Sequence, residues 1–476
     1  MEASIAPPLR KGVLHLLSGS VFGRGLNFGL NLLLSRVLGP SGLGLLTLVL
    51  TTAQTFEISA LGGVDYGVSC ALTGKDAAET TEARQKIAAA ATRFVGVTTF
   101  FLAVVLWLWL VPFEGLLPAD LGDSRSWISL GLVGISIIES LGSLPWVFFL
   151  ILGQTRIVAL RQGLFAPTRL VGALCGSLIA AAPGAIGGYA LISFLQWIWL
   201  RQRCKALLHS LTHQRVRIRE IWSLVRAGLP LYVANSLAGL VFLPLLANVA
   251  NSEGVNEVGY LRIGQMVVQM FTLLPGALVP LLFLRLRSNT GGNDKAQMQN
   301  HEPSLRLIWC LGLTALLLYL LVDHLLVMWF FGEVFLPSIQ PTRVLVLCAV
   351  LDSANQVLHT PLLASRRTGL FSLGQNSGAI IAAVLGLWLI PSLGLQGYLI
   401  AKFGFSLIPV LIYSAETWKK FNSPNLVPML LLATAAVTPM CWWSLPSNQL
   451  QIGLMLLSIV LIIRCAWPLK KLVHLT

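Results

Sequence analysis

The fold class of this chain is decided by stretches such as Phe94-Val-Gly-Val-Thr-Thr-Phe-Phe-Leu-Ala-Val-Val-Leu-Trp-Leu-Trp-Leu-Val111, which contains no charged side chain. An apolar run of about 20 residues is long enough to cross a bilayer as a helix. Similar runs recur along all 476 residues, of which 55% are hydrophobic and only 11% are charged. Because a soluble domain carries about 25% charged residues, the composition excludes a water-soluble enzyme and a disordered scaffold. The sequence predicts a multi-pass membrane protein.

Charged residues and Pro/Gly-rich breaks divide the chain into about fourteen predicted membrane-spanning helices. The predicted class is therefore all-α. The connecting segments are short, so we expect no soluble domain on either face. The spans lie at 13–35, 43–66, 88–111, 127–151, 160–182, 185–201, 223–248, 257–284, 305–331, 341–364, 370–390, 395–415, 426–445 and 450–468.

The positive charges lie almost entirely on alternate connecting segments. If the N-terminus is cytoplasmic, 26 of the 33 Lys and Arg residues fall on the inner side, four fall within spans, and three (Arg36, Arg125 and Arg343) fall outside. Short cytoplasmic loops of membrane proteins carry such an excess. We therefore predict that both termini are cytoplasmic. The net charge of +14 reports orientation and gives no support to a nucleic-acid partner.

Two segments of the chain resemble each other. The stretch Ala185-Ile-Gly-Gly-Tyr-Ala-Leu-Ile192 is similar to Gly394-Leu-Gln-Gly-Tyr-Leu-Ile-Ala401. This repeat unit covers about six spans, and an even number of crossings relates the two copies by an axis along the membrane normal. We predict two parallel six-helix lobes, 1–204 and 222–415. A basic cytoplasmic linker at 205–221 would join them, and 416–476 would add two further helices.

Eight ionisable residues lie within the predicted spans. A charged side chain inside the bilayer is costly, so each must face protein or water. Four are basic and four are acidic, so the set is neutral. One reading is structural ion pairing between helices, and the other is a functional site. The eight are Arg24, Glu57, Asp65, Glu139, Arg169, Arg262, Asp352 and Lys402.

Polar residues at helical spacing connect some of these charges into stripes, which indicates a hydrated cavity or a polar seam between helices. Stripes on early helices of both predicted lobes favour the cavity.

Arginine binds phosphate oxygens through two parallel hydrogen bonds and keeps its charge, so Arg24 and Arg262 are predicted to hold an anion. Glu57, Glu139 and Asp352 are candidates for ion coupling or for pairing with the basic residues. The predicted substrate-binding residues are Arg24, Asn27, Asn31, Gln54, Arg262, Gln265 and Gln269.

The sequence lacks the motifs of soluble catalysis. Gly74-Lys75 is followed by Asp76, so there is no GxxxxGK[ST] loop, and no HExxH, GxSxG or Cys/His metal spacing is present. The seven cysteines are scattered, mostly in apolar stretches, without a CxxC pair. We therefore expect neither an ATP-driven pump nor an enzyme, and no cofactor or metal.

The stretch Asn31-Leu-Leu-Leu-Ser-Arg-Val-Leu-Gly-Pro-Ser-Gly-Leu-Gly-Leu-Leu-Thr47 resembles the first hairpin of the bacterial oligosaccharide flippases. These form the polysaccharide-transporter branch (O-antigen and teichoic-acid export) of the multidrug/oligosaccharidyl-lipid/polysaccharide (MOP) superfamily. The family hairpin reads Ser-Arg-x-Leu-Gly-Pro-x-Gly-x-Gly, which Ser35 to Gly44 match closely. Leu45 departs from it, because many members have Tyr there. The segment from Leu362 through Arg366 to Gly397 resembles a later hairpin of the family.

The resemblance implies a V-shaped bundle of two lobes around a central cationic cavity. Such proteins carry an undecaprenyl-pyrophosphate-linked oligosaccharide from the cytoplasmic to the outer leaflet of the bacterial inner membrane by alternating access, without ATP. Arg24 is the best positional match to the family's first-helix arginines, and Arg262 is a looser one. The implied partners are this lipid-linked oligosaccharide, the bilayer and other glycan-assembly membrane proteins.

Two other functions stay open at the level of the sequence. A multidrug exporter of the same superfamily would move organic cations and would favour acids over arginines in its cavity. A membrane glycan polymerase or ligase commonly carries a sizeable outer loop with catalytic Arg or His, whereas the predicted outer segments are short and hold three basic residues. The leading prediction is therefore a flippase.

Overall fold

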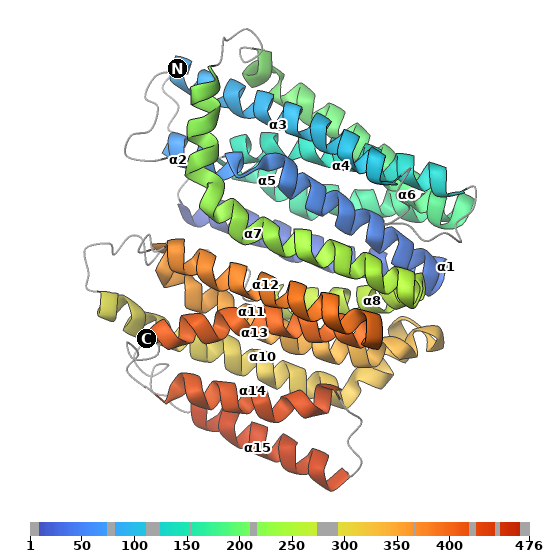
Figure 1. Ribbon diagram of the computed structural model, residues 1–476, viewed down its shortest axis with the longest axis vertical. Coiled ribbons are helices and arrows are strands. Elements are labelled where there is room, and N and C mark those ends of the chain that lie inside the picture. The colour runs from blue at the N-terminus through green and yellow to red at the C-terminus, as the bar shows by residue number, and fades with distance from the viewer. Residues whose placement is uncertain are drawn as a thin grey trace. The chain divides into compact units, whose positions relative to one another are not determined.

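The computed structural model describes residues 9–73, 81–110, 124–151, 154–209, 217–273, 294–364, 368–417, 425–442 and 448–466. Every regular element in these ranges is a helix (Figure 1). A backbone in lipid must satisfy its own hydrogen bonds, and a helix does so within each apolar run. The predicted all-α class is confirmed.

The chain divides into two compact units, Met1–Gly259 and Tyr260–Thr476. The first holds α1 (Leu9–Leu61), α2 (Val64–Thr73), α3 (Thr81–Leu110), α4 (Ser124–Ile151), α5 (Thr155–Leu160), the π-helical turn η2 (Arg161–Phe165), α6 (Ala166–His209), α7 (Ile218–Ser252) and the start of α8 (Val255–Phe271). The second holds the rest of α8, α10 (Asp294–Phe330), the 3-10 helix η3 (Glu333–Ser338), α11 (Ile339–Ala364), α12 (Thr368–Leu393), α13 (Leu395–Thr417), α14 (Leu426–Trp442) and α15 (Asn448–Ala466). The predicted lobe limits stay a prediction, and residues 210–216 of the predicted linker lie outside the described residues.

Each predicted span falls on a helix, although the limits differ: α10 begins at Asp294, whereas its span was predicted from residue 305. Within the described residues, nine helical segments are long and apolar enough to cross a membrane, and two of them, Val21–Leu61 and Arg156–Cys204, each cover two predicted spans. The other three spans correspond to α8 and to the shorter apolar helices Leu426–Trp442 and Gly453–Cys465. Residues 274–284 of the eighth predicted span, and Arg366 of the later hairpin, lie outside the described part of the chain.

A glycine and a proline separate the first two spans. α1 is interrupted at Gly39, which has φ 65° and is followed by Pro40. Glycine adopts a positive φ at little cost, and proline has no N–H to continue the preceding helix. The Gly-Pro pair of the quoted hairpin therefore ends one span and starts the next.

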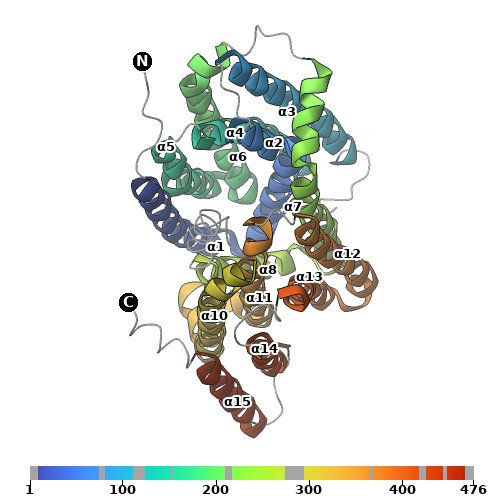
Figure 2. The same cartoon turned by 90° about the vertical axis from the view of Figure 1, so that its left-hand side faces the viewer.

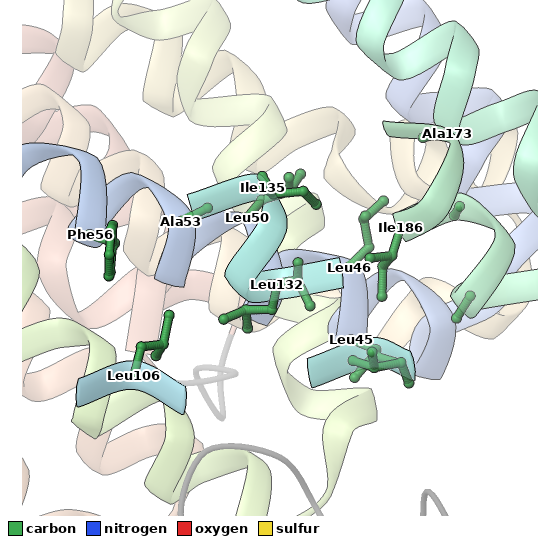
Figure 3. Packing of buried hydrophobic residues seen from close by; sticks show 14 of the residues in the cluster. Leu45, Leu46, Leu50, Ala53, Phe56, Leu106, Leu132, Ile135, Ala173 and Ile186 are labelled. Carbon is green, nitrogen blue, oxygen red and sulfur yellow. The ribbon is translucent and has the colours of Figure 1, made fainter. Parts of the chain in front are cut away.

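The core of the first unit is built by the second half of α1 together with α3, α4 and α6. Leu46, Leu132 and Ile186 are almost completely buried in it (Figure 3). In a bilayer such helices associate mainly through close packing, because lipid is as apolar as leucine. This packing buries Ala53 and leaves its neighbour Gln54 exposed. The core therefore determines which face of α1 remains for polar residues.

The turn that precedes α2 and the start of α2 lie very close to α7. A methyl group added at Gly228 would overlap the backbone carbonyl of Gly63, and one added at Gly67 would overlap the carbonyl of Leu224. Small residues of this kind let membrane helices pack backbone against backbone. The glycines therefore fix the separation of these two segments.

Replacing Gly228 with alanine should destabilise the first unit by about 1–3 kcal/mol, because the new methyl group overlaps backbone atoms. The melting temperature of the detergent-purified protein measures this loss. Gly134→Ala in α4 is the matched control, since a methyl group there meets nothing within 4 Å and alanine favours a helix by about 1 kcal/mol over glycine. Equal melting temperatures for the two variants would contradict the close contact.

In the second unit, α14 and α15 pack against α10 (Figure 1). Arg306 Nη1 donates to the carbonyl of Cys465 at 2.9 Å, and Trp309 Nε1 donates to Thr434 Oγ1 at 3.1 Å. The two helices at the C-terminal end are thus attached to the second unit by buried polar contacts as well as by apolar ones.

Candidate functional site

The polar stripe of the first predicted span lies on the N-terminal half of α1. Asn31 is buried, and its Nδ2 donates to the backbone carbonyl of Asn27 at 2.8 Å. Arg24 Nη1 and Asn27 Oδ1 are buried and have no hydrogen-bond partner in the described residues. Since buried polar atoms are nearly always hydrogen-bonded, these two atoms mark a place for a ligand or for water.

Glu57, on the second half of α1, pairs with a residue that the sequence assigns to the inner end of a span. Its Oε1 lies 3.3 Å from Nη2 of Arg161, in η2. The Arg161 guanidinium also lies 5.5 Å from the ring centroid of Trp146. α5 and η2 lie against α1, which places these groups on neighbouring elements (Figure 2).

The π-helical turn that carries Arg161 has a local cause. The N–H of Ala166 donates to the carbonyl of Arg161, five residues back. Pro167 follows, and because it has no N–H, the carbonyl of Gly163 cannot receive the usual bond from the residue four positions later. A single π turn accommodates such an irregularity, and turns of this kind are frequent at functional sites.

Glu139 and Arg169 form the centre of a buried polar network in the first unit. Arg169 Nη1 lies 2.6 Å from Glu139 Oε1 and 2.7 Å from Oε2, and its Nε donates to Gln196 Oε1 at 2.6 Å. Ser193 Oγ donates to Glu139 Oε1 at 3.1 Å. Gln196 Nε2 donates to the carbonyl of Phe165 at 2.9 Å. The network therefore joins α4 and α6 and also holds the last residue of η2.

Gln196 and Ser193 are functional candidates that the sequence analysis missed. Together with Tyr189, whose ring lies 6.0 Å from the Arg169 guanidinium, they recur at spacings of four and three residues. The same spacing identified the stripe on the first span. Applied to the sixth span, it would have found all three residues.

The candidate residues of the second unit lie on α8, α11 and α13. Arg262 Nη1 donates to Gln265 Oε1 at 3.4 Å, and Gln269 lies one turn further along α8, half-buried. Lys402 Nζ lies 3.2 Å from Asp352 Oδ2. The three acids considered for ion coupling, Glu57, Glu139 and Asp352, are thus each paired with a basic side chain.

A cavity of about 400 Å³ lies within the second unit. Apolar side chains of α8, α10 and α11 line it, including Phe271, Leu311 and Val350, with Ser353 as a polar member. Another cavity, of about 160 Å³, lies within the first unit among α3, α4 and α6, and Arg201 is one of its lining residues. Linings of this kind suit hydrocarbon better than sugar.

Comparison of the structure with solved structures identifies the fold. A lipid II flippase MurJ in an inward-closed conformation superposes with a TM-score of 0.67 at 11% identity, covering 96% of this chain and 99% of that one. An outward-facing multidrug resistance MATE family transporter of the MOP superfamily matches with a TM-score of 0.58 at 13% identity, covering 89% of this chain and 97% of that one. An inward-facing MATE transporter matches with a TM-score of 0.57 at 12% identity, covering 88% and 99%. The chain has the MurJ/MATE fold.

No protein-family model matches the sequence, and no curated protein matches it. The similarity to MurJ and to the MATE transporters is therefore one of fold. It extends over nearly the whole chain and includes both compact units. The architecture implied by the resemblance agrees with this finding, whereas membership of the superfamily and of its branch stays a prediction.

Proposed function

We propose that the chain is a membrane transporter that carries an undecaprenyl-pyrophosphate-linked oligosaccharide from the cytoplasmic to the outer leaflet of a bacterial inner membrane by alternating access. Its fold is that of a lipid II flippase and of multidrug transporters, which supports transport. The observation that carries the substrate class is Arg24, whose buried Nη1 has no hydrogen-bond partner in the described chain. A phosphate oxygen would satisfy this donor.

The charge balance favours an anionic substrate over an organic cation. Glu57, Glu139 and Asp352 already neutralise Arg161, Arg169 and Lys402, so these carboxylates are poorly placed to attract a cation. The proposal assigns Arg24 and Arg262 to the pyrophosphate and the amides of Asn27, Asn31, Gln54, Gln265 and Gln269 to the sugar path. Both termini would be cytoplasmic, and other glycan-assembly membrane proteins would supply the substrate.

The second candidate is an exporter of organic cations, which the MATE transporters among the matching structures favour. It differs from the flippase in the sign of its cargo. Protonation or sodium binding at Glu57, Glu139 or Asp352 would drive either transporter, once the basic partner moves away. The glycan polymerase or ligase gains no support from the fold comparison.

Transport by the full-length chain in proteoliposomes distinguishes the two candidates. One preparation contains an undecaprenyl-pyrophosphate-linked oligosaccharide, and flipping is followed by the access of an external lectin to the sugar. The other contains ethidium, and its export is followed by fluorescence. We expect the chain to speed up glycolipid flipping and to leave ethidium unaffected. Ethidium transport without glycolipid flipping would reject the proposal in favour of the exporter.

A further inference from the structure

Arg161 and Glu57 form an ion pair that is much less complete than its neighbour. The two side chains make one contact, of 3.3 Å, and those of Arg161 and Glu57 are 39% and 18% exposed. In the neighbouring pair, Arg169 is 17% exposed and contacts both oxygens of Glu139 as well as Gln196. A single long contact at a partly exposed site contributes little free energy. The guanidinium of Arg161 is therefore held less firmly than that of Arg169, so Arg161 is the arginine that can change partner.

The surroundings of Arg161 hold its side chain ready for such an exchange. Trp146, buried between Phe149 and Phe165, offers a ring face to the guanidinium. A guanidinium on an aromatic face keeps its N–H edges free for hydrogen bonds. The bond from Gln196 to the carbonyl of Phe165 links η2 to the buried Glu139–Arg169 network, so the backbone around Arg161 is fixed as well.

The position of Arg161 also fits a substrate route. Ala159 and Gly163, two residues on either side of it, lie close to Gly19 of α1: a methyl group added at Gly19 would overlap the carbonyl of Ala159, and one added at Gly163 would lie 3.3 Å from the carbonyl of Gly19. Arg24 lies five residues further along α1, a rise of about 7.5 Å. In the predicted topology, Gly19, Glu57 and Arg161 all lie toward the cytoplasmic ends of their spans. A ligand loaded from the cytoplasm would therefore meet this part of the unit.

Other charged groups act on Glu57 besides Arg161. Besides Arg161, the charged and titratable groups that act on its carboxylate are Glu139 on α4 and Arg169 and Tyr189 on α6. When a phosphate occupies Arg161, the Glu57 carboxylate loses this partner, because Arg169 stays paired with Glu139. The exchange therefore requires that phosphate bind Arg161 more strongly than Glu57 does.

We propose that Arg161 is a phosphate-binding residue of the first unit and that Glu57 is a competing anion built into the protein, which occupies Arg161 when no substrate is bound. This inference rests on the proposed function and adds a residue and an exchange step to it. Phosphate replaces Glu57 because its oxygens match the fork of the guanidinium and accept two hydrogen bonds from it.

The test is binding of inorganic pyrophosphate and of undecaprenyl pyrophosphate to the detergent-purified full-length chain by isothermal titration calorimetry. Arg161→Gln should weaken binding of the lipid about tenfold or more, as expected for the loss of a charge-assisted hydrogen bond. Glu57→Gln should tighten it, because the competing charge is gone. The double variant should bind like Arg161→Gln, and Arg161→Lys should fall between it and the unmodified chain.

Opposite signs for the two single variants distinguish the proposal from a purely structural ion pair, which would predict the same sign for both. Arg156→Gln, an exposed arginine on the preceding helix α5, is the matched control and should bind unchanged. Melting temperatures identify any variant that fails to fold. If Arg161→Gln fails to fold, the binding affinity of Arg161→Lys tests the role of Arg161 instead. If Arg161→Gln binds the lipid as tightly as the unmodified protein, Arg161 has no role in binding, while the proposed function is unaffected. Unmodified protein that binds neither compound overturns the proposed function too.

Discussion

Replacing Arg24 with alanine should abolish glycolipid flipping while leaving the amount of folded protein unchanged. The variant loses the buried Nη1 donor that has no partner in the described residues. A charge-assisted hydrogen bond contributes up to about 3 kcal/mol, so the loss corresponds to about a 100-fold drop in binding or rate. Because Arg24 is half-buried at the polar stripe of α1, truncation should cost activity rather than stability.

Lysine at position 24 and alanine at position 36 provide the comparisons. Arg24→Lys keeps the charge but loses the planar fork that matches phosphate, so it should retain part of the flipping activity. Arg36 lies further along the same helix and is exposed, so Arg36→Ala should flip at the normal rate. Flipping in proteoliposomes measures all three variants. Normal flipping by Arg24→Ala at equal reconstitution would remove Arg24 from the site.

Replacing Glu139 with glutamine should destabilise the protein by about 3–5 kcal/mol, the usual cost of leaving one member of a buried ion pair without its partner. Glu139 is 9% exposed, and Arg169 would keep its charge among α4 and α6 with neutral acceptors, such as the amide oxygen of Gln196, in place of the carboxylate. The melting temperature in detergent, or the population of folded protein after mild heating, measures this loss.

The double variant Glu139→Gln with Arg169→Gln shows whether the loss of stability comes from an unpaired charge or from the change of side chain itself. It removes both charges, so it should recover a substantial part of the stability lost by the single variant. Asp352→Asn in the second unit is the comparison with a more exposed pair, whose side chains are 28% and 23% exposed, and it should lose about 1 kcal/mol or less. A Glu139→Gln variant as stable as Asp352→Asn would contradict the buried network.

The helical architecture could be predicted from the sequence because it depends on local properties. Each apolar run must form its own backbone hydrogen bonds in lipid, and Gly39-Pro40 ends the first span through the conformational limits of two residues. The stripe on α1 was likewise predictable, since Arg24, Asn27 and Asn31 are brought together by helical periodicity alone.

The partners of the charged residues could not be predicted in this way. In the sequence, Arg161 is one of many basic residues at the cytoplasmic ends of the predicted spans, and nothing sets it apart from them. Glu57 lies about one hundred positions earlier in the chain. Only the packing of α5 and η2 against α1 brings them within 3.3 Å. The π turn before Pro167 contributes to this placement, and such a change of helical register leaves no signal in the hydrophobic pattern.

The sequence by itself thus determined that this protein is a bundle of membrane helices, about where along the chain those helices lie, and that one face of the first is polar. The physical reason is that lipid acts on each segment separately, through the cost of burying charge and backbone polar groups. The tertiary structure alone decided which of the intramembrane charges neutralise one another, and that Arg24 keeps a buried donor without a hydrogen-bond partner among the described residues. Pairing depends on distances of a few ångströms between side chains far apart in sequence, and only the packed helices set those distances.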